Sequence, residues 1–175
     1  MTASRTSPAA TLDREFAWFS AVLDARLRSY AEQDVATEAP PPPALAGSDP
    51  YAAACTAAGL GRDERSVLAL ALLPWFRPAA LDPLSLRNAS TDRHFTEFGG
   101  LHSEAGRRFV PTRETSLFII AADDLDRRIA AMPMFAATGT MVRHHLLVQQ
   151  ADDYAPWLPV EPHPQLIERL LGGTG

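Results

Sequence analysis

The stretch that decides the fold is VLALALLPWF, residues 67–76, the most apolar run in the chain. Its large apolar side chains cover nearly every face of a helix, and a helix that is apolar all round is buried. The preceding residues 61–64, GRDE, open the helix. We therefore predict a central helix from Ser66 to about Phe76. The run is too short for the roughly 20 residues of a membrane-spanning helix, and it contains Pro74.

A second strong pattern precedes it, from about Leu12 to Gln33. Apolar residues recur there at helical spacing and form one face: Leu12, Phe16, Phe19, Val22, Leu23, Leu27 and Tyr30. The charged residues occupy the remaining surface: Asp13, Arg14, Glu15, Asp24, Arg26 and Arg28. With Thr11 as the cap, this predicts a long amphipathic helix that packs on the domain or on a partner.

Residues 35–49 separate these two helices and have the composition of a linker. Four consecutive prolines, Pro40 to Pro43, favour a stiff polyproline II segment. We interpret it as a spacer that lets the first helix reach away, with recognition by a proline-binding partner as the alternative. The predicted organisation is an amphipathic helix (1–34), a proline-rich linker (35–49) and an interaction domain (50–172).

The remaining elements are short. Asp49 and Pro50 are a start signal for a helix over residues 51–58. Residues 88–108 are rich in glycine, serine and charge and predict a loop or hairpin. Met141 to Gln150 is the best strand candidate. Further helices are expected over residues 78–87, from Thr112 as a cap, over 125–132 and over 164–171. The predicted fold class is mainly α with a small β-wing (α+β).

The composition excludes several classes of function. All sixteen basic residues are arginine, so the lysine of a Walker phosphate loop, of a protein kinase or of a Schiff-base enzyme is missing. The net charge of −5 opposes nucleic acid as the main partner. Apolar residues at 46% and charged residues at 21% indicate a globular chain. With no signal-peptide pattern, we expect a cytoplasmic protein.

No arrangement of reactive side chains points to catalysis. The lone Cys55 lies in an alanine-rich stretch and is interpreted as a packed side chain. His144 and His145 would point to opposite faces of the expected strand, and His94 and His102 lack a metal-ligand spacing. The acid doublets at 123–124 and 152–153 are typical of helix caps. We predict no enzyme activity, no cofactor and no metal in this chain.

Four segments in order resemble a known family: DERSVLALALLP (63–74), RHFTEFGG (93–100), FVPTRET (109–115) and ADDLDRR (122–128). Together they are similar to the N-terminal winged-helix-like domain of the AAA+ ATPases associated with bacterial contractile injection systems. The resemblance covers roughly residues 62–171. One departure is Arg113, where the family has glycine.

The resemblance implies a non-catalytic interaction or regulatory domain that docks partner or substrate proteins. ATP and Mg²⁺ would belong to a separate AAA+ module, which also provides a route to homo-oligomers. The alternative is a stand-alone winged-helix protein that binds nucleic acid through Arg107 and Arg108. An interleaved set of arginines between residues 87 and 143 is interpreted as a salt-bridged surface or a docking face for an acidic partner. The candidate partner-binding residues are Phe95, Phe98, Arg107, Arg108, Phe16 and Phe19.

Overall fold

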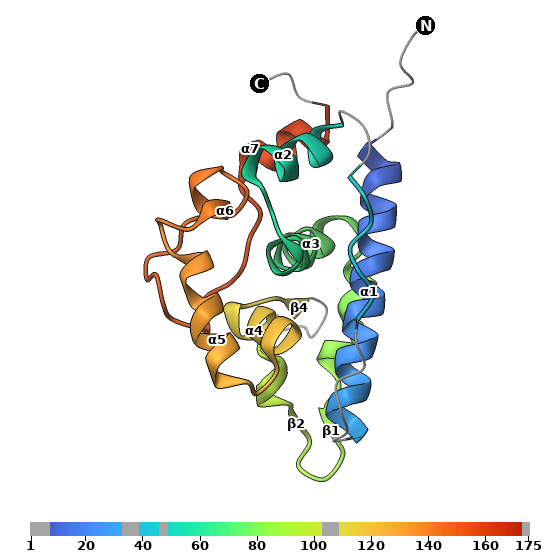
Figure 1. The fold of residues 1–175 in the computed structure, drawn as a ribbon. Coiled ribbons are helices and arrows are strands. Elements are labelled where there is room, and N and C mark those ends of the chain that lie inside the picture. The colour runs from blue at the N-terminus through green and yellow to red at the C-terminus, as the bar shows by residue number, and fades with distance from the viewer. Residues whose placement is uncertain (1–7, 33–38, 46–48, 103–108, 173–175) are drawn as a thin grey trace, which may run out of the picture.

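The computed structural model describes residues 8–32, 39–45, 49–102 and 109–172. Its centre is α3 (Arg62–Phe76), whose residues from Arg65 to Leu73 are all buried. Figure 1 shows α3 end-on, with α1 (Pro8–Glu32) standing along one side and the α4–α6 region on the other. The prediction of a central, fully enclosed helix is confirmed.

The other helices pack around α3. α2 (Pro50–Ala58) and α7 (Pro164–Leu170) lie side by side at one end of the molecule (Figure 1). α4 (Arg113–Ala121) contacts both α1 and α3, and α5 (Leu125–Ala131) and α6 (Thr140–Arg143) follow on the side away from α1 (Figure 1). Three 3₁₀ segments connect them: η1 (Pro78–Ser85), η2 (Thr96–Phe98) and η3 (Met132–Phe135).

The predicted helix caps at Asp49, Thr112 and Asp124 are confirmed by hydrogen bonds. The predicted cap at Thr11 was wrong, because α1 begins at Pro8 and the buried Thr11 hydroxyl donates to the Asp49 carboxylate at 2.8 Å. Asp49 accepts from the backbone N–H groups of the first turn of α2. Thr112 forms a capping box with Thr115 at the start of α4, which satisfies two backbone donors at once. Asp124 caps α5. These short polar side chains explain where each helix begins.

The β-structure is small. β1 (Arg87–Asn88) pairs antiparallel with β2 (Arg93–His94), and Arg87 lies opposite His94. β3 (Leu101–His102) pairs antiparallel with β4 (Phe109–Val110), and His102 lies opposite Phe109. The described part of the fold is therefore mainly α with two short antiparallel pairs, which agrees with the predicted α+β class.

The expected strand over residues 141–150 was wrong. The chain forms the short helix α6, and the backbone turns at His145, which has a positive φ of 53°. Met141, Val142, Leu146 and Leu147 are buried while residues 143–145 are exposed. That spacing is one helical turn followed by a reversal and differs from the two-residue alternation of a half-buried strand. Only an isolated bridge, Leu147 with Pro162, has β character here.

The interpretation of residues 35–49 as a spacer that frees the first helix is also corrected, for the described part. Polyproline II backbone makes no internal hydrogen bonds, so its carbonyls are open to other donors. Trp18 Nε1 donates to the Pro40 carbonyl at 2.8 Å, and Arg65 donates to that of Pro43 at 2.8 Å. Ala39 and Leu45 pack against the core. Residues 39–45 therefore hold α1 against α3.

Among the described residues, no single helix has the length and apolar character to cross a membrane. α3 and η1 taken together have the length and composition of a membrane span, but the pair is bent by 108° between them.

Candidate functional site

The predicted anchor loop, Phe95 to Gly100, lies in an aromatic cluster inside the molecule. Phe98 is buried at the centre, with its ring 4.9 Å from that of Phe118 on α4 and 5.3 Å from that of Tyr30 on α1. Phe95 is half-buried and lies 5.0 Å from Phe98. The cluster joins η2, α1 and α4. Edge-on and tilted packing of this kind contributes beyond simple area burial.

The two glycines that follow are required by close contact. Gly99 has a φ of 59°, and a Cβ there would lie 2.7 Å from the Thr115 backbone nitrogen. A Cβ on Gly100 would overlap the ring of Phe109. The Gly100 N–H donates to the Thr112 hydroxyl at 3.1 Å. The loop therefore packs against the first turn of α4 within the same chain.

The other predicted partner-binding residues divide into two groups. Phe16 and Phe19 are buried in the core on α1, so a partner reaches them only if α1 separates from α3. Arg107 and Arg108 lie outside the described residues.

A buried ionic network between α1 and α3 was missed from sequence. Glu15, expected on the surface, is 1% exposed and receives two hydrogen bonds from Arg65, at 2.8 and 2.6 Å. The Tyr51 hydroxyl donates to the same carboxylate at 2.9 Å. The guanidinium of Arg65 also lies 5.6 Å from the ring of Trp18. The signal in the sequence is the position of Glu15 next to Phe16, inside the apolar face of α1.

Burial at this network raises the pKa of two groups, Tyr51 and Cys55. Burial, followed by the proximity of Cys55 and Glu15, raises the pKa of Tyr51 well above its usual range. Burial raises the pKa of the Cys55 thiol to about 12. A thiol with that pKa is a poor nucleophile at neutral pH, so Cys55 acts as a packed side chain, as interpreted from sequence.

The histidines do not form a metal centre in the described part of the chain. His94 and His102 stack with ring centroids 3.6 Å apart and planes 11° apart. Imidazole lone pairs lie in the ring plane, so parallel stacked rings cannot aim at one ion. His145 is near His163, whose Nδ1 caps α7. No group of three or more ligating side chains was found among the described residues.

The acid doublets hold backbone. Asp124 caps α5, and Asp152 accepts from the N–H groups of Tyr154 and Ala155 at 2.7 and 2.9 Å. These two bonds lower the pKa of Asp152. Asp153 accepts from Ala137 at 3.1 Å. Capping and turn formation therefore account for the hydrogen bonds of these carboxylates.

Arg113, where the resembled family has glycine, is buried at the start of α4. Its guanidinium lies 5.7 Å from the ring of Phe135 and donates to the Ala155 carbonyl at 3.5 Å. Burial lowers the pKa of Arg113, while Asp152 and Asp153 act to raise it. The side chain thus fills the space between α4, η3 and the loop of residues 152–158.

An open groove of about 420 Å³ lies between α1, α3, α4 and α5. Three arginines from three different helices line it: Arg26, Arg62 and Arg127. Among the described lining residues the one carboxylate is that of Asp63, 3.8 Å from Arg127. From sequence, Arg26 was expected on the surface, and only Arg127 was grouped with the arginine cluster. We call this feature the arginine groove.

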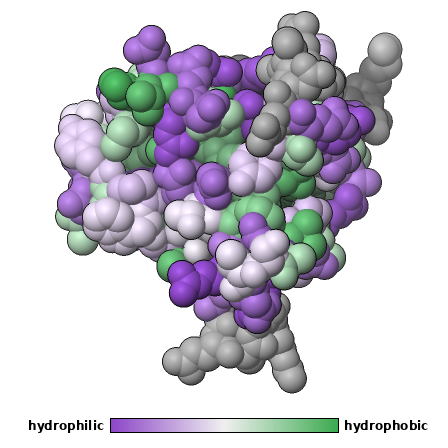
Figure 2. All heavy atoms as spheres, turned by 90° about the horizontal axis from the view of Figure 1, so that it is seen from below, coloured by the Kyte–Doolittle hydropathy of each residue, from purple (hydrophilic) through white to green (hydrophobic). Residues whose placement is uncertain are grey.

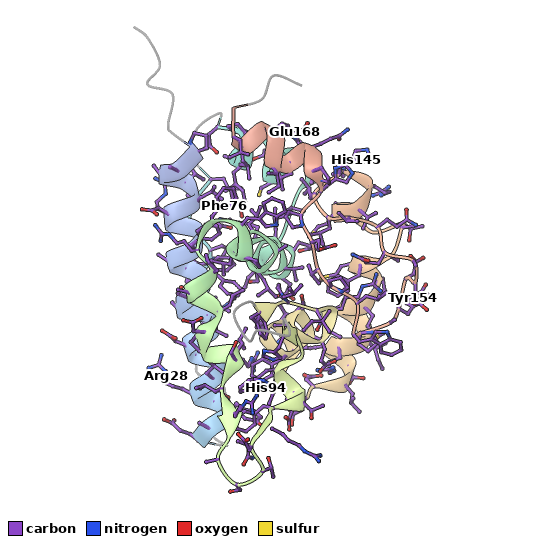
Figure 3. The ribbon with its side chains drawn as sticks, turned by 180° about the vertical axis from the view of Figure 1, so that it is seen from behind. Arg28, Phe76, His94, His145, Tyr154 and Glu168 are labelled. Carbon is purple, nitrogen blue, oxygen red and sulfur yellow. The ribbon has the colours of Figure 1, made fainter. Side chains whose placement is uncertain are left out.

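Four large apolar side chains are exposed on α5 and on the loop after α6. Leu125 and Ile129 are 71% and 67% exposed, and their spacing places them on one face of α5. Tyr154 and Trp157, in the loop after α6, are 62% and 68% exposed. Figure 3 shows Tyr154 at the outer edge of the molecule. We call these four residues the α5 surface.

The α5 surface and its loop are held in place through α4. The Pro156 carbonyl accepts from the Glu114 N–H at 2.8 Å, and the Glu114 carboxylate accepts two hydrogen bonds from Arg128 of α5. Both segments therefore contact the first turn of α4. The end of the molecule in Figure 2 is mostly hydrophilic, with apolar atoms showing between the polar side chains.

Comparisons with protein-family models, with curated proteins and with solved structures found no match to this chain.

Proposed function

We propose that this chain is a non-catalytic interaction domain that docks partner or substrate proteins for an AAA+ ATPase of a contractile injection system. The observation that carries the docking role is the α5 surface, with four large apolar side chains each more than three-fifths exposed. Single exposed apolar residues are ordinary, but a group of them on neighbouring segments marks an interaction site. Tyrosine and tryptophan are also enriched in such interfaces.

The link to the ATPase family rests on the four resembling segments, and the structure offers physical reasons for their residues. FGG seals the start of α4, Thr112 caps it, and Asp124 caps α5. In the proposed winged-helix-like layout, the hairpin of β1 and β2 takes the place of the wing. ATP and Mg²⁺ belong to the separate AAA+ module, which is also the proposed source of any ring-shaped assembly.

The test is pairwise binding of the full chain to the AAA+ module and to injection-particle proteins encoded beside it, by biolayer interferometry. The variant Leu125→Asp with Ile129→Asp places two charges on the α5 surface. Because desolvating unpaired charges in an interface is costly, we expect binding at least about tenfold weaker. Both side chains are exposed, so thermal stability should stay close to that of the wild type.

Leu171→Asp is the matched control, since Leu171 is 72% exposed and lies just after α7. It should bind as the wild type does. Absence of binding to every one of these proteins would refute the proposal, as would wild-type binding by the double variant. Salt-sensitive binding to duplex DNA in place of protein would favour the winged-helix alternative.

A further inference from the structure

We propose that the arginine groove binds a short acidic peptide segment of a partner protein, with a small apolar side chain on the groove floor and carboxylates on the arginines. This deepens the proposed function, because it assigns a second contact to the same docking domain. The groove is separate from the α5 surface: Arg127 points from α5 to the groove, while Leu125 and Ile129 lie on another face.

Positive charge is in local excess among the described residues of the groove. Outside it, four arginines pair with carboxylates: Arg65 with Glu15, Arg128 with Glu114, Arg77 with Asp13 and Arg87 with Asp92. Three others, Arg28, Arg113 and Arg169, hydrogen-bond to backbone carbonyls. In the groove, Arg26 and Arg62 hydrogen-bond to neutral backbone carbonyls of the described residues. A carbonyl orients a guanidinium without cancelling its charge, so the groove keeps an excess of positive charge.

The guanidinium groups of Arg26 and Arg62 are held in fixed orientations. Arg26 Nε donates to the Ile119 carbonyl at 3.0 Å, and an Arg62 Nη donates to the Ala39 carbonyl at 2.6 Å. Each guanidinium is thereby fixed through one nitrogen, and the described residues give its other N–H groups no acceptor. Fixed guanidinium forks suit the two oxygens of a carboxylate, and little further ordering is needed on binding.

Electrostatics within the groove agree with this geometry. Burial lowers the pKa of Arg26, and the nearby charge of Arg127 lowers it further, while Asp123 acts to raise it. The two arginines therefore repel each other across the groove. An anion placed between them would relieve that repulsion. Asp63 and Asp123 partly offset the positive charge of these arginines.

The floor of the arginine groove is apolar. Between the arginines the groove is lined by apolar residues of three segments: Val22, Ala25, Ala39, Ile119 and Ile120. Inorganic phosphate would gain nothing from such a floor, whereas a peptide can place an alkyl side chain on it. A polynucleotide draws its affinity from many neutralised phosphates. Three arginines beside Asp63 match the two or three charges of a short acidic motif.

The probe is a fluorescein-labelled peptide of glutamate pairs separated by leucine, titrated with the full chain and followed by fluorescence anisotropy. A matched peptide with glutamine in place of glutamate measures the contribution of charge. We expect Arg127→Gln and Arg26→Gln each to weaken binding about tenfold, as for a charged contact at an interface. Arg87→Gln, an exposed arginine on β1 outside the groove, should leave binding unchanged.

Arg26 also holds the end of α4, so its variant is checked by thermal unfolding, whereas exposed Arg127 tests the groove without that complication. Equal binding of the glutamine peptide would overturn the inference, as would wild-type affinity in Arg127→Gln. So would displacement of the peptide by a single-stranded oligonucleotide at stoichiometric concentration. The double variant at Leu125 and Ile129 should still bind the peptide, so failure of this inference and failure of the proposed function are read on different variants.

Discussion

Two regions of the molecule differ in how they hold charge. In the buried network between α1 and α3, Glu15 and Arg65 are 1% and 6% exposed and hydrogen-bond to each other, to Tyr51 and to Pro43. In the arginine groove, Arg26 of α1, Arg62 of α3 and Arg127 of α5 line an open space. The α5 surface also carries exposed aromatic and aliphatic side chains.

The difference separates stability from recognition. The charged groups of the buried network pair with each other away from solvent, so they fix how α1 and the proline segment dock. Arg26 and Arg62 hydrogen-bond to neutral carbonyls, so within the described chain no carboxylate pairs with them. The apolar side chains of the α5 surface are likewise exposed to solvent. We infer that the buried pair Glu15 and Arg65 has a structural role, and that recognition belongs to the arginine groove and the α5 surface.

The largest effect should come from Arg65→Met, which removes one partner of the buried pair. Glu15 would then remain buried with only the Tyr51 hydroxyl as a donor in the described structure. Leaving a buried charge without its partner costs about 3–5 kcal/mol. We expect urea denaturation to show a loss of that order in the free energy of unfolding.

The control is the double variant Glu15→Met with Arg65→Met. Replacing both members of a buried ion pair by apolar residues is often neutral or stabilising. The double variant should therefore recover most of the lost stability, apart from the hydrogen bond that Tyr51 loses. If Arg65→Met alone unfolds at the same urea concentration as the wild type, the two regions do not differ as argued.

A second, smaller effect is expected at the aromatic cluster. Phe98→Ala removes a buried ring, and such truncations cost about 3 kcal/mol or somewhat more. Phe95→Ala removes a half-buried ring and should cost roughly half as much on the same area argument. Guanidinium denaturation measures both. An unchanged stability in Phe98→Ala, with a loss of partner binding, would restore this loop as a direct contact.

Much of the fold was predictable because its signals are local. The caps Asp49, Thr112 and Asp124 each act on the next few residues, and α3 is apolar on every face. The strand expected over residues 141–150 failed because apolar residues at 141, 142, 146 and 147 fit one helical turn and a reversal as well as an extended run. His145 in the left-handed region carries no strong sequence signal.

The candidate site was less predictable because its parts are distant in sequence. Arg26, Arg62 and Arg127 come together only when α1, α3 and α5 pack, and their spacing in the sequence does not predict this. The buried position of Glu15 depends equally on Arg65, which is fifty residues away. Phe98 was predicted to bind a partner, whereas the ring contacts that the structure shows for it are with Tyr30 of α1 and Phe118 of α4.

The smallest effect concerns the stacked pair His94 and His102, which lies between the two hairpins in neither of the compared regions. His94 is labelled on β2 in Figure 3. Burial lowers the pKa of His102 from 6.5, and the charges of His94 and Arg87 lower it further. Phe109, opposite His102, lies with its ring 5.4 Å away and brings no charge.

A lowered pKa in the folded state means that the unfolded chain binds the proton first as the pH falls. The stabilising contribution of His102 is therefore complete above pH 6.5 and is lost as the pH falls through its folded pKa. His163, whose pKa is also lowered by burial, adds a pH dependence of stability of the same sign.

Thermal unfolding between pH 7.5 and 5 should show a small decrease in the midpoint for the wild type. His102→Phe keeps a flat ring against His94 and removes one titrating group, so its decrease should be smaller, while His144→Gln, at an exposed position, should behave as the wild type. An identical pH profile for the wild type and His102→Phe would mean that the stacked pair does not couple protonation to folding.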